Sequence, residues 1–220
     1  MSSAPTFPAV AAPQGGAAGL GSGPAPGLPI TPALEFAPGL LLAARGAGAG
    51  IGAAIFDVDG VLTDGRIYIG EQGETFKAFS TLDGHGLKLL AQGGIVPIVV
   101  TGRDSPGVRR RVADLGLAHA VYGAGDKLAA SEAVLATLGF EWSRVAVIGD
   151  DWPDLPLLHR AAFSCAPPGA HIEARSVAHH VTAAAAGYGA AREFCDLLLV
   201  AAGRYARLLH GPQRSLDGAR

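Results

Sequence analysis

The sequence has few cysteines, no basic excess and no long apolar run, and each shortage excludes a class of protein. Its two cysteines, Cys165 and Cys195, provide no disulfide framework, so we expect two reduced, buried thiols. The formal net charge of -2 argues against the clustered basic surface that nucleic-acid binding requires. No apolar run reaches the ~18 residues of a membrane span, and the N-terminus lacks a basic segment followed by an apolar core, so we expect no secretory signal. We therefore expect a cytoplasmic protein without nucleic-acid or membrane partners.

Glycine and proline are plentiful, with 32 and 15 residues, and together with alanine they dominate the chain up to about residue 31. Dense prolines prevent a regular helix, and glycines raise the entropy lost on ordering. We predict a disordered tail over residues 1–31, a folded domain over 32–205 and a flexible tail over 206–220. A short helix within residues 33–45 is expected to be interrupted at Pro38–Gly39.

Short apolar runs alternate with helix-like segments throughout the folded part. Buried strands are predicted at 53–56, 95–100, 118–122, 144–148, 162–165 and 179–182. Helices are predicted at 83–92, from Pro106, at 127–138 and 155–160, near residue 170 and at 190–202, the first of them capped by Asp83. Two β-prone runs around a glycine-containing turn predict a hairpin within residues 66–80. This alternation indicates a doubly wound α/β domain with a mostly parallel sheet.

Polar residues stand at, or just beyond, the carboxyl ends of the predicted strands. They are Asp57, Asp59, Thr101, Lys127, Asp150 and Asp151. Ligands of open parallel sheets bind at this edge, so these side chains are expected to share one site. Asp57 and Asp59 point the same way on a strand, and two such carboxylates repel unless a cation or a shared proton intervenes. The pattern therefore indicates metal and phosphoryl chemistry.

These residue types fit the hydrolysis of a phosphate monoester in two steps. Asp57 would attack as nucleophile and form an aspartyl phosphate. Asp59 would protonate the leaving alcohol and later deprotonate the attacking water. Thr101 and Lys127 would stabilise the phosphoryl oxygens. Mg²⁺ prefers hard oxygen ligands, which Asp57, Asp150 and the backbone carbonyl of Asp59 could supply.

Four motifs resemble those of the haloacid dehalogenase superfamily of phosphohydrolases. They are Asp57–Val58–Asp59–Gly60–Val61, Thr101–Gly102–Arg103, Lys127, and Gly149–Asp150–Asp151–Trp152–Pro153–Asp154. The resemblance implies a Rossmann-like fold of the haloacid dehalogenase type, and the second Asp of the first motif is typical of its phosphatases. Asp151 is expected to be an acid beside the metal, whereas Asp154 either orients Lys127 or caps the following helix.

Residues 50–203 also carry a narrower resemblance, to the 3-deoxy-D-manno-octulosonate 8-phosphate phosphatases. It rests on the Thr-Asp-Gly ending of the first motif and on the segments 79–84 and 189–197. The resemblance implies hydrolysis of that sugar-acid phosphate with Mg²⁺, in the biosynthesis of the lipopolysaccharide inner core. It further implies a homotetramer in which a neighbouring subunit covers the active site, with a small hairpin flap and no separate cap domain.

The same resemblance implies a set of substrate contacts. These are Asp59, Ser80, Thr81, Leu82, Asp83, Gly84, Lys88, Arg103, Arg111 and Lys127. Arg192 is either a surface charge or a contact that reaches a neighbouring active site. Two positions depart from the family pattern. The family often has a polar or basic residue where Leu82 stands, and a Gln near the position of Tyr122. The alternative substrate is a nine-carbon, sialic-acid-type 9-phosphate.

Two functions of other classes compete with hydrolysis. A phosphoacceptor receiver domain also combines a doubly wound sheet with aspartates, a Thr or Ser and a Lys. In receivers the acidic pair comes early and the phosphorylated Asp stands alone, whereas here Asp57–Val58–Asp59 comes first and the double-Asp motif late. A non-catalytic oligomeric or regulatory domain would not need the intact Asp57 and Asp59. The residue order therefore favours the hydrolase.

Overall fold

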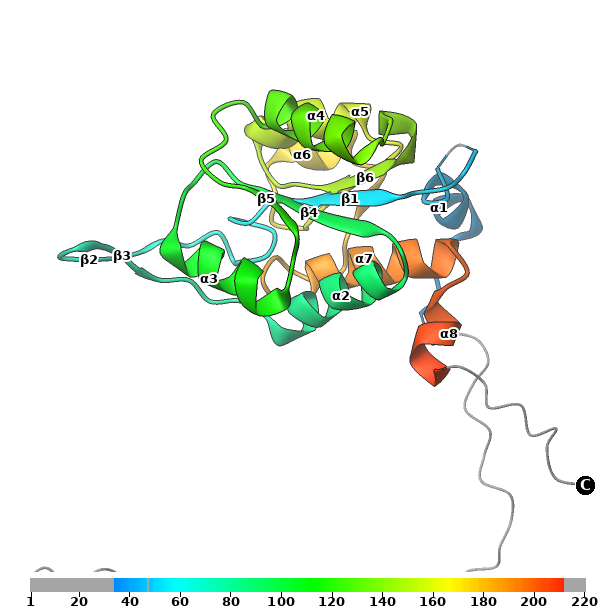
Figure 1. Cartoon of the computed structure of the whole chain (residues 1–220), viewed down its shortest axis with the longest axis horizontal. Coiled ribbons are helices and arrows are strands. Elements are labelled where there is room, and N and C mark those ends of the chain that lie inside the picture. The colour runs from blue at the N-terminus through cyan, green and yellow to red at the C-terminus, as the bar shows by residue number, and fades with distance from the viewer. Residues whose placement is uncertain (1–33, 47, 212–220) are drawn as a thin grey trace, which may run out of the picture.

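A six-stranded parallel sheet forms the centre of the molecule (Figure 1). The structure is a computed structural model that describes residues 34–46 and 48–211, so the predicted tail over residues 1–31 lies outside the described part. Strand β1 (Ala53–Phe56) is central and pairs with β4 (Val96–Val100) and β6 (Val145–Ile148). The sheet order is β5-β4-β1-β6-β7-β8, with outer strands β5 (His119–Val121), β7 (Phe163–Ala166) and β8 (His180–Val181).

Helices cover both faces of the sheet (Figure 1). On one side lie α1 (Pro38–Ala43), α2 (Thr81–Gln92), α3 (Pro106–Leu115) and α7 (Ala190–Ala201). On the other lie α4 (Lys127–Leu138), α5 (Leu155–Arg160) and α6 (Ile172–Val177), with the short 3-10 turns η1 (Trp142–Arg144) and η2 (Trp152–Asp154) nearby. Successive strand residues point to opposite faces, so Phe56 packs in the first core and Ile55 in the second. The predicted α/β fold is confirmed.

Two helix boundaries and one additional helix differ from the prediction. Helix α1 begins at Pro38 and is not broken there, because proline is tolerated in the first helical turn. Helix α2 begins at Thr81, two residues earlier than predicted, since the Ser80 hydroxyl accepts the Leu82 N–H at 3.2 Å as the cap.

The third difference is at the C-terminal end of the described chain. A further helix, α8 (Tyr205–His210), occupies the start of the segment predicted as a flexible tail over residues 206–220. Tyr205 and Leu208 pack against the core below the sheet, which explains the added order. Residues 212–220 lie outside the described part.

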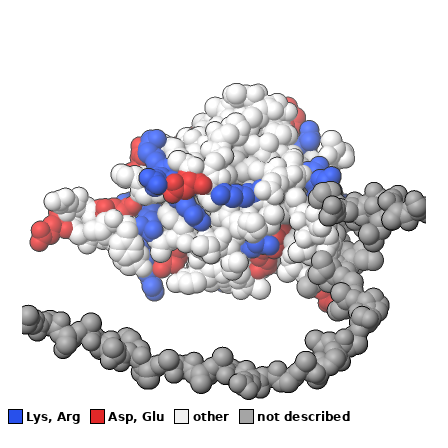
Figure 2. Space-filling view, turned by 60° about the horizontal axis from the view of Figure 1, so that its bottom comes forward, with Lys and Arg blue, Asp and Glu red and all other residues white. Residues whose placement is uncertain are grey.

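The predicted hairpin is formed by β2 (Tyr68–Gly70) and β3 (Gly73–Phe76), which among the described strands pair only with each other. It projects from the carboxyl edge of the sheet, at the left of Figure 1, and no separate cap domain occurs among the described residues. On the face shown in Figure 2, basic and acidic side chains are interspersed on a mostly uncharged surface. Both cysteines are free and buried. No helix in the described ranges is long and apolar enough to cross a membrane.

Candidate active site

Three neighbouring strands bring the predicted catalytic residues to one edge of the sheet. Asp57 follows β1, Thr101 follows β4 and Asp150 follows β6 after one glycine. Lys127, the first residue of α4, places its Nζ 2.7 Å from Asp57 Oδ1 and 2.7 Å from Asp154 Oδ1. Burial alone would lower the pKa of Lys127, but the two carboxylates raise it above its ordinary value, so the lysine stays charged.

An acidic cluster formed by Asp57, Asp150 and Asp154 lies beside this lysine. One carboxylate oxygen from each residue lies within 4.8 Å of the others. Burial, together with repulsion from Asp154, raises the pKa of Asp57 to about 6 despite the attraction of Lys127. Burial and the charges of Asp57 and Asp154 raise the pKa of Asp150 to about 8. Such a concentration of buried negative charge fits a bound cation, which would favour the ionised carboxylates.

The backbone at Gly60 lets the segment after β1 approach the carboxylate of Asp150 closely. Its φ of 94° lies in the left-handed region, and a Cβ there would come within 2.0 Å of Asp150 Oδ2. The first motif therefore forms a space that the carboxylate of Asp150 fills. Oxygen ligands gathered in this way suit Mg²⁺ or a similar hard dication.

The carboxylate of Asp59 lies outside the acidic cluster. It turns toward the hairpin, where Oδ1 pairs with Lys77 Nζ, while Oδ2 is buried without a hydrogen-bond partner among the described residues. Of the predicted metal ligands, Asp57 and Asp150 thus come together, and the third carboxylate near them belongs to Asp154. Only the backbone carbonyl of Asp59 stays a candidate metal ligand.

Of the two roles that the sequence left open, Asp154 fills the first: it contacts Lys127, whereas its side chain makes no capping hydrogen bond to α5. Besides contacting Lys127, its Oδ2 accepts the backbone N–H groups of Asp150 at 3.1 Å and Asp151 at 3.4 Å. It therefore orients the lysine and holds the turn that presents Asp150. The side chain of Asp151 is exposed at the start of η2, and its role beside the metal stays a prediction.

Thr101 and Arg103 lie in the turn after β4, opposite the hairpin. Thr101 is buried, and its hydroxyl accepts the Arg103 N–H at 3.3 Å. The half-exposed Arg103 side chain reaches Glu74 Oε2 at 3.4 Å and lies with its Nε 4.0 Å from Asp59 Oδ2. A cation at this place can contact an anionic substrate.

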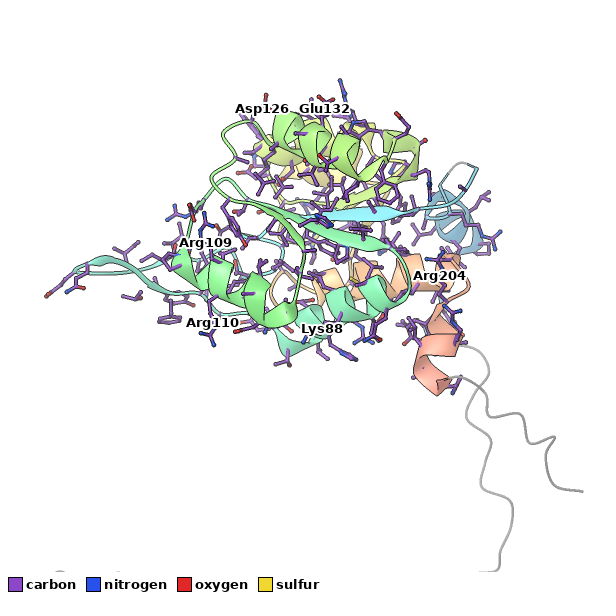
Figure 3. All side chains as sticks on the ribbon, in the orientation of Figure 1. Lys88, Arg109, Arg110, Asp126, Glu132 and Arg204 are labelled. Atoms are coloured by element: carbon purple, nitrogen blue, oxygen red, sulfur yellow. The ribbon has the colours of Figure 1, made fainter. Side chains whose placement is uncertain are left out.

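The other predicted substrate contacts divide into three groups. Ser80, Thr81 and Leu82 line a hollow of about 450 Å³, with Asp64, Tyr68 and Tyr188 among its other walls. Gly84 is buried against the guanidinium of Arg111, whose Nη2 donates to the Ser80 carbonyl at 3.0 Å. Lys88 is exposed on α2, at the bottom of Figure 3, and is not among the residues that line this hollow.

Asp83 contacts the start of helix α7, and Arg192 forms an ion pair within that helix. The buried Asp83 carboxylate accepts hydrogen bonds from the backbone N–H groups of Gly189 at 3.2 Å and Arg192 at 2.8 Å. It therefore provides acceptors for the free N–H groups at the start of α7 and not for those at the start of α2. Burial raises the pKa of Asp83 although these backbone groups oppose the shift. The Arg192 guanidinium pairs with Asp196 at 2.8 Å on the same helix. Its reach toward a neighbouring subunit stays a prediction.

Three residues around Asp59 were not anticipated: Glu74, Lys77 and Ser105. The Lys77 side chain is fully buried, with Nζ on Asp59 and 3.4 Å from Glu74 Oε2. Glu74 also accepts the hydroxyl of Ser105, a hydrogen bond that lowers the pKa of Glu74 below its usual range. The only sequence signal was a pair of opposite charges, Glu74 and Lys77, within a β-prone run.

Comparisons with known proteins agree with this geometry. Residues 121–194 match the family model of haloacid dehalogenase-like hydrolases. The 3-deoxy-D-manno-octulosonate 8-phosphate phosphatase of Yersinia pestis is 44% identical over 147 residues, which are 67% of this chain and 79% of that protein. The relatives support the phosphatase interpretation over the receiver-like one.

Two solved structures are similar throughout the domain. The crystal structure of the Moraxella catarrhalis 3-deoxy-D-manno-octulosonate 8-phosphate phosphatase, in complex with magnesium, phosphate and KDO, has a TM-score of 0.73 at 38% identity, covering 78% of this chain and 97% of that one. The cobalt-bound form of the Haemophilus influenzae phosphatase has a TM-score of 0.70 at 37% identity, covering 76% and 94%.

Proposed function

Because this chain belongs to the family of 3-deoxy-D-manno-octulosonate 8-phosphate phosphatases, we propose that it hydrolyses this ester to 3-deoxy-D-manno-octulosonate and phosphate. The reaction is a step in the biosynthesis of the lipopolysaccharide inner core. The observation that carries the proposal is the position of Asp57, which contacts Lys127 and clusters with the carboxylates of Asp150 and Asp154 at the carboxyl edge of the sheet.

Asp57 begins the reaction by attacking phosphorus. A bond forms between its carboxylate oxygen and phosphorus as the bond from phosphorus to the sugar oxygen breaks. Asp59 gives a proton to that oxygen, so the sugar leaves as an alcohol. Lys127 and Thr101 donate hydrogen bonds to the phosphoryl oxygens, which stabilises the charge they carry in the transition state.

Water completes the cycle. Asp59, now ionised, takes a proton from the water that attacks the aspartyl phosphate, and the bond between Asp57 and phosphorus breaks. Inorganic phosphate leaves and both aspartates return to their starting states. Asp57, Asp150 and the backbone carbonyl of Asp59 would hold Mg²⁺, which offsets the repulsion between carboxylate and phosphoryl oxygens.

We also propose a cytoplasmic homotetramer in which a neighbouring subunit completes the cover of the active site. Supporting this are the exposed apolar side chains of Ile69 and Phe76 on the hairpin and of Leu82 and Tyr188 beside the hollow. Apolar groups that surround an open site indicate a protein partner. A two-stranded hairpin is also marginally stable unless it packs against something.

The direct test is phosphate release from a panel of eight- and nine-carbon sugar-acid phosphates, with Mg²⁺ and with a chelator. We expect the fastest turnover on 3-deoxy-D-manno-octulosonate 8-phosphate, loss of activity in the chelator, and no activity in Asp57→Asn. Faster turnover of a nine-carbon 9-phosphate would instead identify the substrate as a sialic-acid-type 9-phosphate. No phosphate release from any member of the panel would contradict the proposal.

A further inference from the structure

A lysine on the hairpin, with a fully buried side chain, contacts the proposed acid–base residue. Lys77 directly follows β3, yet its side chain is 0% exposed. Its Nζ pairs with Asp59 Oδ1 and lies 3.4 Å from Glu74 Oε2. A buried ammonium group is tolerated only when carboxylates compensate its charge, so these contacts determine where Lys77 lies.

The contact makes the two oxygens of Asp59 unequal. Oδ1 is occupied by Lys77, whereas Oδ2 is buried and has no hydrogen-bond partner among the described residues. A buried oxygen without a partner is unfavourable unless a ligand or a proton satisfies it. Arg103 Nε lies 4.0 Å from Oδ2, too far for a hydrogen bond. Oδ2 is therefore the oxygen left for proton transfer.

Glu74 fixes the lysine from the other side. One of its oxygens accepts the hydroxyl of the buried Ser105, and the other lies 3.4 Å from both Lys77 Nζ and Arg103 Nη2. The hairpin is thus joined to the segment after β4 through Glu74 and to the segment after β1 through Lys77. Both segments carry catalytic residues of the proposed mechanism.

We propose that Lys77 is a positioning residue for proton transfer by Asp59, and that Glu74 holds Lys77 in place. By occupying Oδ1, Lys77 directs Oδ2 to give its proton to the sugar oxygen as Asp57 attacks phosphorus and the ester bond breaks. This inference rests on the proposed function. It assigns the hairpin a part in the chemistry in addition to covering the site.

The test compares substrates that do and do not need a proton on the leaving group. A sugar alcohol leaves poorly without one, whereas the leaving groups of p-nitrophenyl phosphate and acetyl phosphate are acidic and depart unaided. The parameter kcat/KM reports steps only through release of this group. For Lys77→Met we expect about a 100-fold loss of kcat/KM on the sugar phosphate, as for a misplaced general acid. On the activated phosphates we expect less than about a 5-fold loss, and Lys77→Arg should recover part of the difference.

Matched variants on the same hairpin provide the controls. Arg66→Met and Glu71→Gln alter exposed charges and should leave kcat/KM unchanged on both kinds of substrate. Glu74→Gln should lower kcat/KM on the sugar phosphate selectively, by about 10-fold. Equal losses on both kinds of substrate, with thermal unfolding unchanged, would show a merely structural role and overturn the inference. A wild-type enzyme active on the activated phosphates but not on sugar-acid phosphates would instead overturn the proposed function, and the inference with it.

Discussion

At the scale of single residues, Gly60 determines how close the Asp150 carboxylate can come to the segment that carries Asp57. Its left-handed backbone and missing side chain leave room for Asp150 beside the segment that carries Asp57 and Asp59. A side chain here meets two obstacles, because the conformation is unfavourable for other residues and the space is filled. The position therefore couples backbone geometry to the proposed metal site.

We predict that Gly60→Ala disables the site while leaving the fold intact. The added Cβ would displace the Asp150 carboxylate, and a displacement near 1 Å can lower kcat about 10²-fold. Phosphate release and calorimetric Mg²⁺ titration would measure the loss. Gly139→Ala is the matched control, since Gly139 has a similar φ of 71° but no heavy atom within 4 Å of an added Cβ. It should lower stability by about 1–2 kcal/mol and keep its activity. Equal activity losses in the two variants would contradict the prediction.

The sequence is informative about residues that follow buried strands and uninformative about residues that reach the site from elsewhere. Asp57, Thr101 and Asp150 were predictable because parallel strands end at one edge, and the structure places them there. Lys77 was not, because a lysine in an irregular hairpin is ordinarily solvated. Its burial depends on how the hairpin folds back over Asp59, a long-range contact that no local pattern encodes.

At the scale of elements, the start of helix α7 depends on carboxylates that bind backbone N–H groups. Asp83 reaches it from α2, and Glu193 connects it to the chain after β8. Glu193 accepts the N–H of Ala184 at 2.9 Å and contacts His180 at 2.9 Å. This explains why Asp83 was misplaced as the cap of its own helix: its partners are more than a hundred positions away in the chain.

We predict that Glu193→Gln destabilises the protein in a pH-dependent manner. Burial would raise the pKa of Glu193, but hydrogen bonds from His180, Ala184 and Ala183 lower it below the usual 4.5. The folded state therefore favours the carboxylate, and its stabilisation is present above 4.5 and is lost as the pH falls below that value. We expect a loss of about 1–2 kcal/mol of unfolding free energy at neutral pH, measured in urea.

Acidic pH provides the internal control for Glu193. As the carboxylate of the wild-type protein becomes protonated, the difference between it and the Gln variant should shrink. The exposed Glu173→Gln serves as a matched substitution without such backbone contacts, and it should change stability little at any pH. A difference between wild type and Glu193→Gln that stayed constant through the acidic range would refute the ionic explanation.

At the scale of the whole molecule, apolar side chains are exposed at both ends of the sheet, but only one end carries the site. Ile69 on the hairpin is 68% exposed and Leu42 on α1 is 69% exposed. The hairpin and α1 lie on opposite sides of the molecule in Figure 1, with the hairpin at the carboxyl edge. A partner that covers the active site would bury the first and not the second.

We predict a tetramer in light scattering that Ile69→Lys disrupts and Leu42→Lys does not. A charge on the hairpin would have to be desolvated in the interface, whereas a charge on α1 would stay in water. Static light scattering after gel filtration measures the mass directly. A monomeric wild-type protein at working concentration would contradict the shared active site.

In the proposed tetramer, the hairpin would make the activity per molecule depend on the concentration of the enzyme. Two strands without a third are marginally stable alone, yet this pair carries the lysine that contacts Asp59. If neighbouring subunits hold the hairpin in place, dilution that separates them loosens Lys77 while the sheet stays folded. Activity per molecule would then fall at low enzyme concentration, although each subunit still contains the complete acidic cluster.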